Sequence, residues 1–246
     1  EKHGFHVTMH VAETQADNET ALQQYGRRTV ELLDEVGLLG PHFLAVHCVW
    51  LIPSDIQRLA ASQTPVSHNA VCNMYLGSGV SRVPDLLEAG VTVALGTDGA
   101  ASNNTFDMIE TLKVTALLHK VVRRDPRAIS AEKVLEMATI DAAEALGLDR
   151  EIGSLEVGKR ADLFIYDPAQ AKSTPMNRPP STLVFSGAAS GVRTVVVDGR
   201  VVLEEGAFTA VDEGEVLARA QRQCDQLVER AGVGHLRACR WPGKSA

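Results

Sequence analysis

Residues 91–104, with the sequence VTVALGTDGAASNN, place a short apolar run directly before a Thr-Asp-Gly turn. The apolar run at 91–95 predicts a buried strand, and Asp98 follows the point where that strand ends. Three earlier segments repeat the same order of apolar run, polar residue and helical stretch. Their predicted strands cover residues 5–11, 43–49 and 65–67.

Between these strands, apolar residues recur at helical spacing. The predicted helices cover residues 22–39, 53–61, 83–87 and 104–122, and one or two further helices are expected over 131–146. Asn104, with Asp107 three residues later, predicts the cap of the long fourth helix. Strands that alternate with helices indicate an α/β fold with a parallel sheet. Four such units fit either a doubly wound sheet or half of an eight-stranded barrel.

After residue 150 the pattern changes to short β-rich runs punctuated by glycine. Asp198-Gly199 between two such runs predicts a tight hairpin turn. A helix is expected over 211–231 and a frayed tail over 241–246. We therefore expect an α/β part over residues 1–150, a β part over residues 151–210, and a terminal helix and tail over residues 211–246.

Composition excludes several classes of protein. The formal net charge is −7 over 246 residues and no long Lys/Arg run occurs, so nucleic-acid binding through phosphate neutralisation is not expected. No segment approaches the roughly 18 apolar residues of a membrane span, and residues 1–6 lack the apolar core of a signal peptide. The four cysteines, at positions 48, 72, 224 and 239, are widely spaced, which argues against a disulfide framework and against a thiolate zinc site. We expect a cytoplasmic protein with reduced thiols, in which Cys48 and Cys72 are small buried apolar groups.

Polar side chains follow each of the four predicted strands. They are His10 with Glu13, His47, His68 and Asp98. Because the carboxyl ends of parallel strands meet at one rim, these side chains are expected to converge there. Histidine and aspartate are suitable ligands for zinc or iron(II), and an open coordination position would hold water.

Side chains alternate between the two faces of a strand, so His6, Thr8 and His10 are predicted on one face, with Phe5, Val7 and Met9 on the other, toward the helices.

Other polar residues are expected to have structural or surface positions. His6 is expected to be a satisfied interior histidine, whereas Asn73 is expected to shape the mouth of a pocket. Surface positions are expected for His3, His42, His119 and His235.

The motifs His10-Val11-Ala12-Glu13-Thr14, Val46-His47-Cys48, Ser67-His68-Asn69 and residues 95–104 resemble the amidohydrolase superfamily. Within it they resemble the branch that holds the 5-methylthioadenosine/S-adenosylhomocysteine deaminases and the triazine hydrolases. Residues 152–163 are similar to that superfamily's return into its flanking β-sandwich. The resemblance covers about residues 6–208.

This resemblance implies a (β/α)8 metal-dependent hydrolase barrel with a flanking β-sandwich. The four units here resemble barrel strands five to eight, and the sequence contains no His-x-His pair of the kind that ends the superfamily's first strand. We therefore expect this chain to be the carboxyl-terminal half of the barrel plus part of the sandwich, within a longer protein.

The resemblance also implies roles for individual residues. His10 and Asp98 would bind one divalent metal, usually zinc, with iron as the alternative. Asp98 would also take the proton of the metal-bound water, and His47 would stabilise its attack. Glu13 would face the substrate and pass a proton to its ring nitrogen. Apart from the resemblance, His68 is expected either to support the metal site or touch the leaving group, or to hold the loop behind the site.

The implied reaction is hydrolytic deamination of an amino-purine, its nucleoside or a related amino-azine. Two alternatives stay open: a triazine-type hydrolase with a halide or alkylamine leaving group, and a non-catalytic fragment that needs its missing half. The expected partner is a small-molecule substrate, with a homo-oligomer implied only by the resemblance. Because His10 and Asp98 are fewer than the three protein ligands of a usual catalytic zinc site, we expect the chain alone to be inactive.

Overall fold

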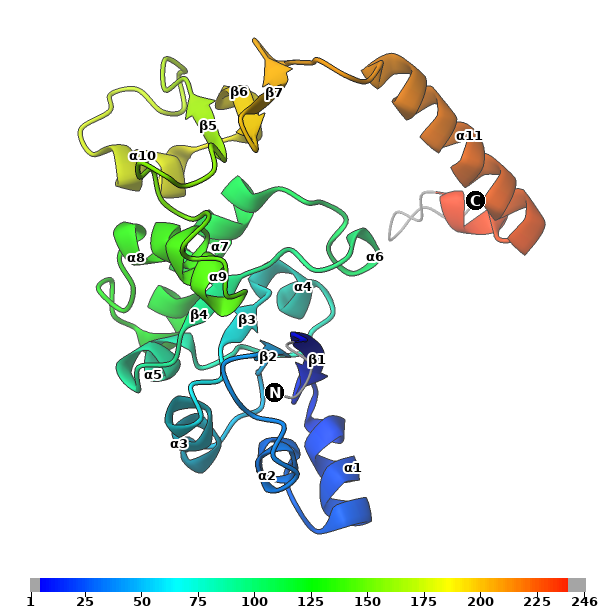
Figure 1. Cartoon of the computed structure of the whole chain (residues 1–246). Coiled ribbons are helices and arrows are strands. Elements are labelled where there is room, and N and C mark those ends of the chain that lie inside the picture. The colour runs from blue at the N-terminus through cyan, green and yellow to red at the C-terminus, as the bar shows by residue number, and fades with distance from the viewer. Residues whose placement is uncertain (1–4, 239–246) are drawn as a thin grey trace.

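Two four-stranded sheets organise the chain in the computed structural model, which describes residues 5–238 (Figure 1). The first sheet is parallel, with its strands in chain order. Its members are β1 (Val7–Val11), β2 (Phe43–His47), β3 (Val66–His68) and β4 (Val93–Leu95). The register pairs His10 with Val46 and His68 with Leu95, so the ends of neighbouring strands lie at one edge, as predicted.

Helices follow each of these strands. They are α1 (Gln15–Tyr25), α2 (Thr29–Glu35), α3 (Pro53–Ala61), α4 (Ala70–Tyr75), α5 (Val83–Glu88), α6 (Ala100–Asn103), α7 (Met108–Arg123), α8 (Ala131–Met137) and α9 (Ile140–Ala145). The core between sheet and helices includes Phe43, Leu59, Leu86, Val93 and Met137, all nearly inaccessible to solvent. Each such side chain stabilises the fold by about 1.5–3 kcal/mol.

Two of the predicted helices differ in the structure. The single helix expected over 22–39 is two helices, because Gly26 adopts a left-handed conformation with φ 68° and its N–H bonds to the Leu22 carbonyl, which ends α1. The prediction that Asn104 is the N-cap of the long helix is wrong as well. Asn104 ends α6 with φ 66°, whereas the Asp107 side chain caps α7 by accepting from the N–H groups of Ile109 and Glu110.

The first strand is more exposed than the sequence suggested. Val7 and Met9, expected to face the helices, have 40% and 41% of their surface exposed, and His10 is exposed too. Among the described residues, β1 and β4 each pair with one neighbouring strand and form the two edges of the parallel sheet.

The second sheet is antiparallel and comprises β5 (Leu163–Tyr166), β6 (Val192–Val197), β7 (Arg200–Glu204) and β8 (Ala207–Phe208). Asp198 and Gly199 connect β6 to β7 with φ of 49° and 75°, which confirms the predicted hairpin. A helix, α10 (Pro179–Ser186), contacts α7 and α8, and the short 3₁₀ helix η1 (Ala189–Gly191) precedes β6. The boundaries predicted at residues 150 and 210 remain predictions.

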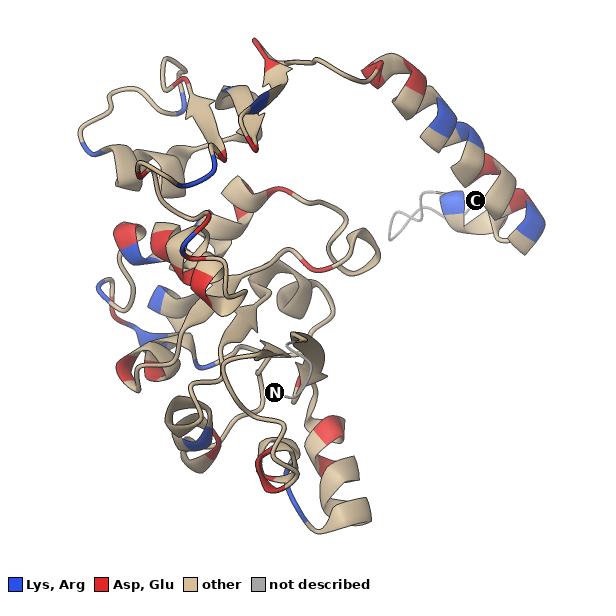
Figure 2. Cartoon of the chain, in the orientation of Figure 1, with Lys and Arg blue, Asp and Glu red and all other residues tan. Residues whose placement is uncertain are grey.

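The last long helix, α11 (Glu213–Ala231), has no buried residue and stands apart from both sheets (Figure 1). Basic and acidic residues are interspersed along it (Figure 2). It is followed by the 3₁₀ helix η2 (Gly234–Arg237), and the tail predicted over 241–246 lies outside the described residues. No helix within residues 5–238 is long and apolar enough to cross a membrane.

Candidate active site

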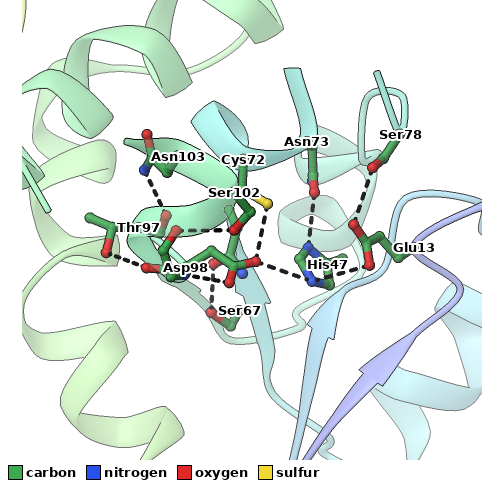
Figure 3. Close-up of polar contacts among 12 residues, drawn as sticks. Glu13, His47, Ser67, Cys72, Asn73, Ser78, Thr97, Asp98, Ser102 and Asn103 are labelled. Carbon is green, nitrogen blue, oxygen red and sulfur yellow. Dashed lines mark hydrogen bonds and ion pairs between the residues drawn. The ribbon is translucent and has the colours of Figure 1, made fainter. Parts of the chain in front are cut away.

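Left-handed backbone conformations occur where three strands of the parallel sheet end. Ala12 after β1, His47 at the end of β2 and Asp98 after β4 have φ of 47°, 71° and 62°. Non-glycine residues adopt positive φ at a cost, and such residues concentrate at functional sites. Here the sharp turns bring the side chains of Glu13, His47 and Asp98 together (Figure 3).

His47 lies between the two carboxylates. Its Nε2 is 3.6 Å from Glu13 Oε2 and 3.5 Å from Asp98 Oδ2. The His47 side chain is 1% exposed, whereas those of Glu13 and Asp98 are 22% and 24% exposed. The predicted convergence of these three residues is therefore present, with the imidazole at the base and the carboxylates open to solvent.

Asn73 of α4 fixes the orientation of the His47 ring. Its Oδ1 is 2.9 Å from His47 Nδ1, and both side chains are buried. An amide oxygen only accepts, so Nδ1 carries the proton and donates it to Asn73. Nε2 is then the ring nitrogen that faces the two carboxylates. Asn73 thus lies behind His47, whereas the prediction from sequence was a position at the mouth of a pocket.

Asp98 accepts hydrogen bonds on both carboxylate oxygens. The Gly99 N–H donates to Oδ1 at 2.5 Å, and the Cys72 thiol donates to Oδ2 at 3.1 Å. Partial burial acts to raise the pKa of Asp98, but the hydrogen bonds from Cys72 and Gly99 and the nearby His47 outweigh it, so the pKa lies below its usual value. Burial, with the Asp98 hydrogen bond, raises the pKa of Cys72 to about 11, so the thiol keeps its proton at neutral pH.

Glu13 is held by the loop that follows α4. The Ser78 hydroxyl donates to Glu13 Oε1 at 3.1 Å, and the Ser78 carbonyl accepts from Trp50 Nε1 at 2.8 Å. Gly79 has φ 124°, and a Cβ there would lie 2.9 Å from Val49 Cγ1. The loop therefore packs closely against the end of β2, and it leaves Glu13 Oε2 free to face His47.

Two residues of this site, Cys72 and Ser78, were missed as functional candidates. Cys72 lies four residues after His68, on the helix that directly follows β3, and this position on the rim was the available signal. Ser78 had no comparable signal, because it reaches Glu13 across 65 residues of chain.

His10 and His68 occupy different surroundings from the central three residues. The His10 ring lies 5.2 Å from the His47 ring, centroid to centroid, and is exposed. His68 is fully buried, and its Nε2 lies 3.1 Å from Nε2 of His119 on α7. Its Nδ1 has no hydrogen-bond partner among the described residues.

Two expectations about other histidines are wrong. His119 is buried rather than on the surface, because its face of α7 packs toward the sheet. His6 is exposed rather than interior, and its ring meets that of His42 edge to face at 4.9 Å. His42 and His235 are exposed as predicted, and His3 lies outside the described residues.

The donor chemistry at this rim fits a zinc-like divalent cation, since imidazole nitrogen and carboxylate oxygen are its usual ligands. Within residues 5–238, one group of three donors lies with all ligand atoms within 4.8 Å of one another, and it consists of Glu13, His47 and Cys72. The predicted ligands His10 and Asp98 flank this group, through the His10–His47 ring contact and the Cys72–Asp98 hydrogen bond.

Curated relatives match this chain over almost all of its length. It is 45% identical over 230 residues to the 5'-deoxyadenosine deaminase of Methanosarcina acetivorans, covering 94% of this chain and 52% of the relative. It is 43% identical over 226 residues to the 5-methylthioadenosine/S-adenosylhomocysteine deaminase of Syntrophomonas wolfei, covering 92% and 52%. The chain thus spans about half the length of the curated relatives it matches.

Solved structures give the same relationship. An adenosine deaminase from Xanthomonas campestris with bound zinc superposes with a TM-score of 0.88 at 33% identity, covering 90% of this chain and 50% of that one. Atrazine chlorohydrolase TrzN from Arthrobacter aurescens, in complex with zinc, superposes with a TM-score of 0.85 at 26% identity, covering 90% and 49%. The two sheets therefore correspond to roughly half of the fold of these enzymes.

The sequence profile of the Amidohydrolase family matches residues 1–202, a range that contains the parallel sheet, β5, β6, the start of β7 and all the residues of the site. The chain belongs to the Amidohydrolase family.

Proposed function

We propose that this chain supplies catalytic groups for hydrolytic deamination of an adenosine-type nucleoside. The observation that carries the proposal is the convergence of Glu13 and Asp98 on His47 Nε2, at 3.6 and 3.5 Å. The activities of the relatives support the substrate class, since they are deaminases of 5'-deoxyadenosine and of 5-methylthioadenosine or S-adenosylhomocysteine.

In this reaction, water adds to the ring carbon that bears the amino group, and ammonia leaves as that carbon becomes a carbonyl. Asp98 accepts a proton from the attacking water, and its lowered pKa means that it is in the ionised form that can accept one. His47 Nε2, buried and held by Asn73, stabilises the charge that develops beside it. Glu13 is partly exposed and donates a proton to the ring nitrogen, which makes the carbon more electrophilic.

A divalent cation, zinc by analogy with the two zinc-containing structures, would be held by His10 and Asp98. When bound, it lowers the pKa of a coordinated water to about 7. The His10 ring is exposed beside His47, which leaves its nitrogens accessible for this role.

A second candidate is hydrolysis of a substituted triazine, with a halide or alkylamine as the leaving group. The likeness to atrazine chlorohydrolase favours it. Glu13 could protonate a triazine nitrogen as well as a purine nitrogen, so the choice depends on substrate tests. The small-molecule partner follows from either reaction, whereas cytoplasmic location and homo-oligomer formation remain predictions.

The test is a chimera in which residues 1–238 replace the matching half of the Methanosarcina acetivorans deaminase. We expect a folded, zinc-containing protein that deaminates adenosine-type nucleosides faster than it converts halogenated or alkylamino triazines. Glu13→Gln in that chimera should keep zinc and lose about two to four orders of magnitude in turnover, the usual scale for a general acid. A folded, zinc-loaded chimera without turnover on either class, or with unchanged turnover after Glu13→Gln, would contradict the proposal.

A further inference from the structure

Cys72 belongs to the candidate active site but has no part in the proposed reaction. Its Sγ lies with Glu13 and His47 in a group whose ligand atoms are all within 4.8 Å of one another. We propose that Glu13, His47 and Cys72 form a binding site for a thiophilic divalent cation such as Cd²⁺. This ligand set differs from the predicted pair of His10 and Asp98.

The spacing of two donors already suits a tetrahedral ion. Zinc binds nitrogen and oxygen ligands at about 2.0–2.1 Å, so two ligands at a tetrahedral angle lie about 3.3–3.5 Å apart. His47 Nε2 and Glu13 Oε2 are 3.6 Å apart. The Cys72 sulfur lies within 4.8 Å of the other two donors and would move toward the ion to reach a metal–sulfur bond of about 2.3 Å.

The three donors differ in burial, and solvent reaches the group from the side of Glu13. His47 and Cys72 are both 1% exposed, so their donor atoms are held by the surrounding protein. Glu13 is 22% exposed and forms the open side, where a water could complete four-fold coordination. Asn73 holds the Nδ1 side of His47 and Ser78 holds Oε1 of Glu13, which leaves Nε2 and Oε2 as the donors. Such outer contacts orient metal ligands.

The chemistry of the donors selects the ion. A thiolate favours soft cations, whereas a site of carboxylates and carbonyls suits Mg²⁺ and Mn²⁺. Binding requires the Cys72 thiol to lose its proton to solvent, and the metal–sulfur bond replaces the S–H hydrogen bond to Asp98 Oδ2. Occupancy would therefore withdraw Glu13 and His47 from substrate and release one restraint on Asp98. This inhibitory consequence rests on the proposed function, but the binding itself does not.

The experiment is a Cd²⁺ titration of the 246-residue chain in which Cys224 and Cys239 are replaced by serine. Absorbance of the thiolate-to-cadmium charge-transfer band reports sulfur ligation, and circular dichroism checks that each variant is folded. We expect one thiolate-bound Cd²⁺ per chain, with its binding unaffected by excess Mg²⁺. Cys72→Ser should abolish the band. His47→Gln and Glu13→Gln should each weaken binding by about tenfold or more, given that even outer partners of a metal site are worth about 10- to 100-fold in affinity.

Cys48 provides the matched control, since it is a buried thiol that does not belong to the donor group. Cys48→Ala in the same background should keep both the band and the affinity. The proposal is overturned if no band forms, if the band survives Cys72→Ser, or if His47→Gln and Glu13→Gln leave the affinity unchanged, because the ion would then bind a single thiol. Failure of the deaminase chimera would leave these results intact.

Discussion

His68 and His119 share a buried contact in which their Nε2 atoms lie 3.1 Å apart, between β3 and α7. Both rings have almost no exposed surface. One Nε2 donates and the other accepts, so the pair requires at least one neutral ring. Burial, with a smaller effect of Arg123, lowers the pKa of His119 to about 4, and burial with the charges of His119 and His47 lowers the pKa of His68.

We expect this pair to make the fold less stable in mild acid. The unfolded chain takes up protons on these rings near pH 6.5, whereas folded His119 takes one up only near pH 4, so the free energy of unfolding falls as the pH drops through this window. For His119 alone the loss between about pH 7 and pH 5 is about 2 kcal/mol. Urea denaturation at several pH values measures it.

His119→Gln is the informative variant, because glutamine does not titrate and can still hydrogen-bond to His68. Its stability should fall less steeply than that of the wild type over this pH range. His42→Gln, which changes an exposed histidine, should leave the wild-type slope in place. Equal slopes for wild type and His119→Gln would show that the buried pair does not control the pH dependence.

The burial of His119 also shows where sequence analysis was limited. Thr111, Thr115 and His119 recur every four residues on α7 and are all buried. Because these residues are polar, the buried face of α7 was not recognised from the sequence, although their four-residue spacing is that of one helix face. The short helices α4 and α6, of six and four residues, escaped prediction as well, and neither has the first-turn proline of the equally short α5.

The strands and the convergence at their ends were predictable, because short apolar runs mark strands and parallel strands end at one edge. The register that places Val11 beside His47 follows from this arrangement. The contacts of Cys72 with Asp98 and of Ser78 with Glu13 depend on how loops fold across the rim. Such contacts join residues 26 and 65 positions apart and leave no periodic trace in the sequence.

Substitutions of Asp107 test whether its side chain caps the start of α7. Its side chain accepts hydrogen bonds at 2.8 and 3.1 Å from the first N–H groups of the helix. Asp107→Ala should lower the free energy of unfolding by about 1 kcal/mol in urea denaturation, the typical value of a helix cap. Asp107→Ser, which keeps an acceptor, should retain most of the stability. Equal losses in the two variants would argue that capping is not the cause.

Substitutions of Asn73 test whether its side chain sets which nitrogen of the His47 ring carries the proton. In protein labelled with nitrogen-15 on histidine, the His47 ring should carry its proton on Nδ1 when neutral, because Asn73 Oδ1 can only accept. Asn73→Leu should remove this preference, and Asn73→Asp, which keeps an acceptor, should preserve it. A wild-type ring protonated on Nε2 would show that the amide is turned the other way.

The roles of Asp98 and His47 can be separated by zinc binding. The measurement uses the 246-residue chain with Cys72→Ser, together with serine at positions 224 and 239, so that His10 and Asp98 remain the predicted ligands. Asp98→Asn should weaken zinc binding by about tenfold or more in calorimetric titrations, because it removes a charged ligand. His47→Asn should leave the affinity nearly unchanged, because His47 acts on the attacking water rather than on the ion.

In the chimera, the same His47 variant should retain zinc while its turnover falls. If His47→Asn loses zinc as severely as Asp98→Asn, then His47 is a ligand, and the division of roles between these two residues is wrong.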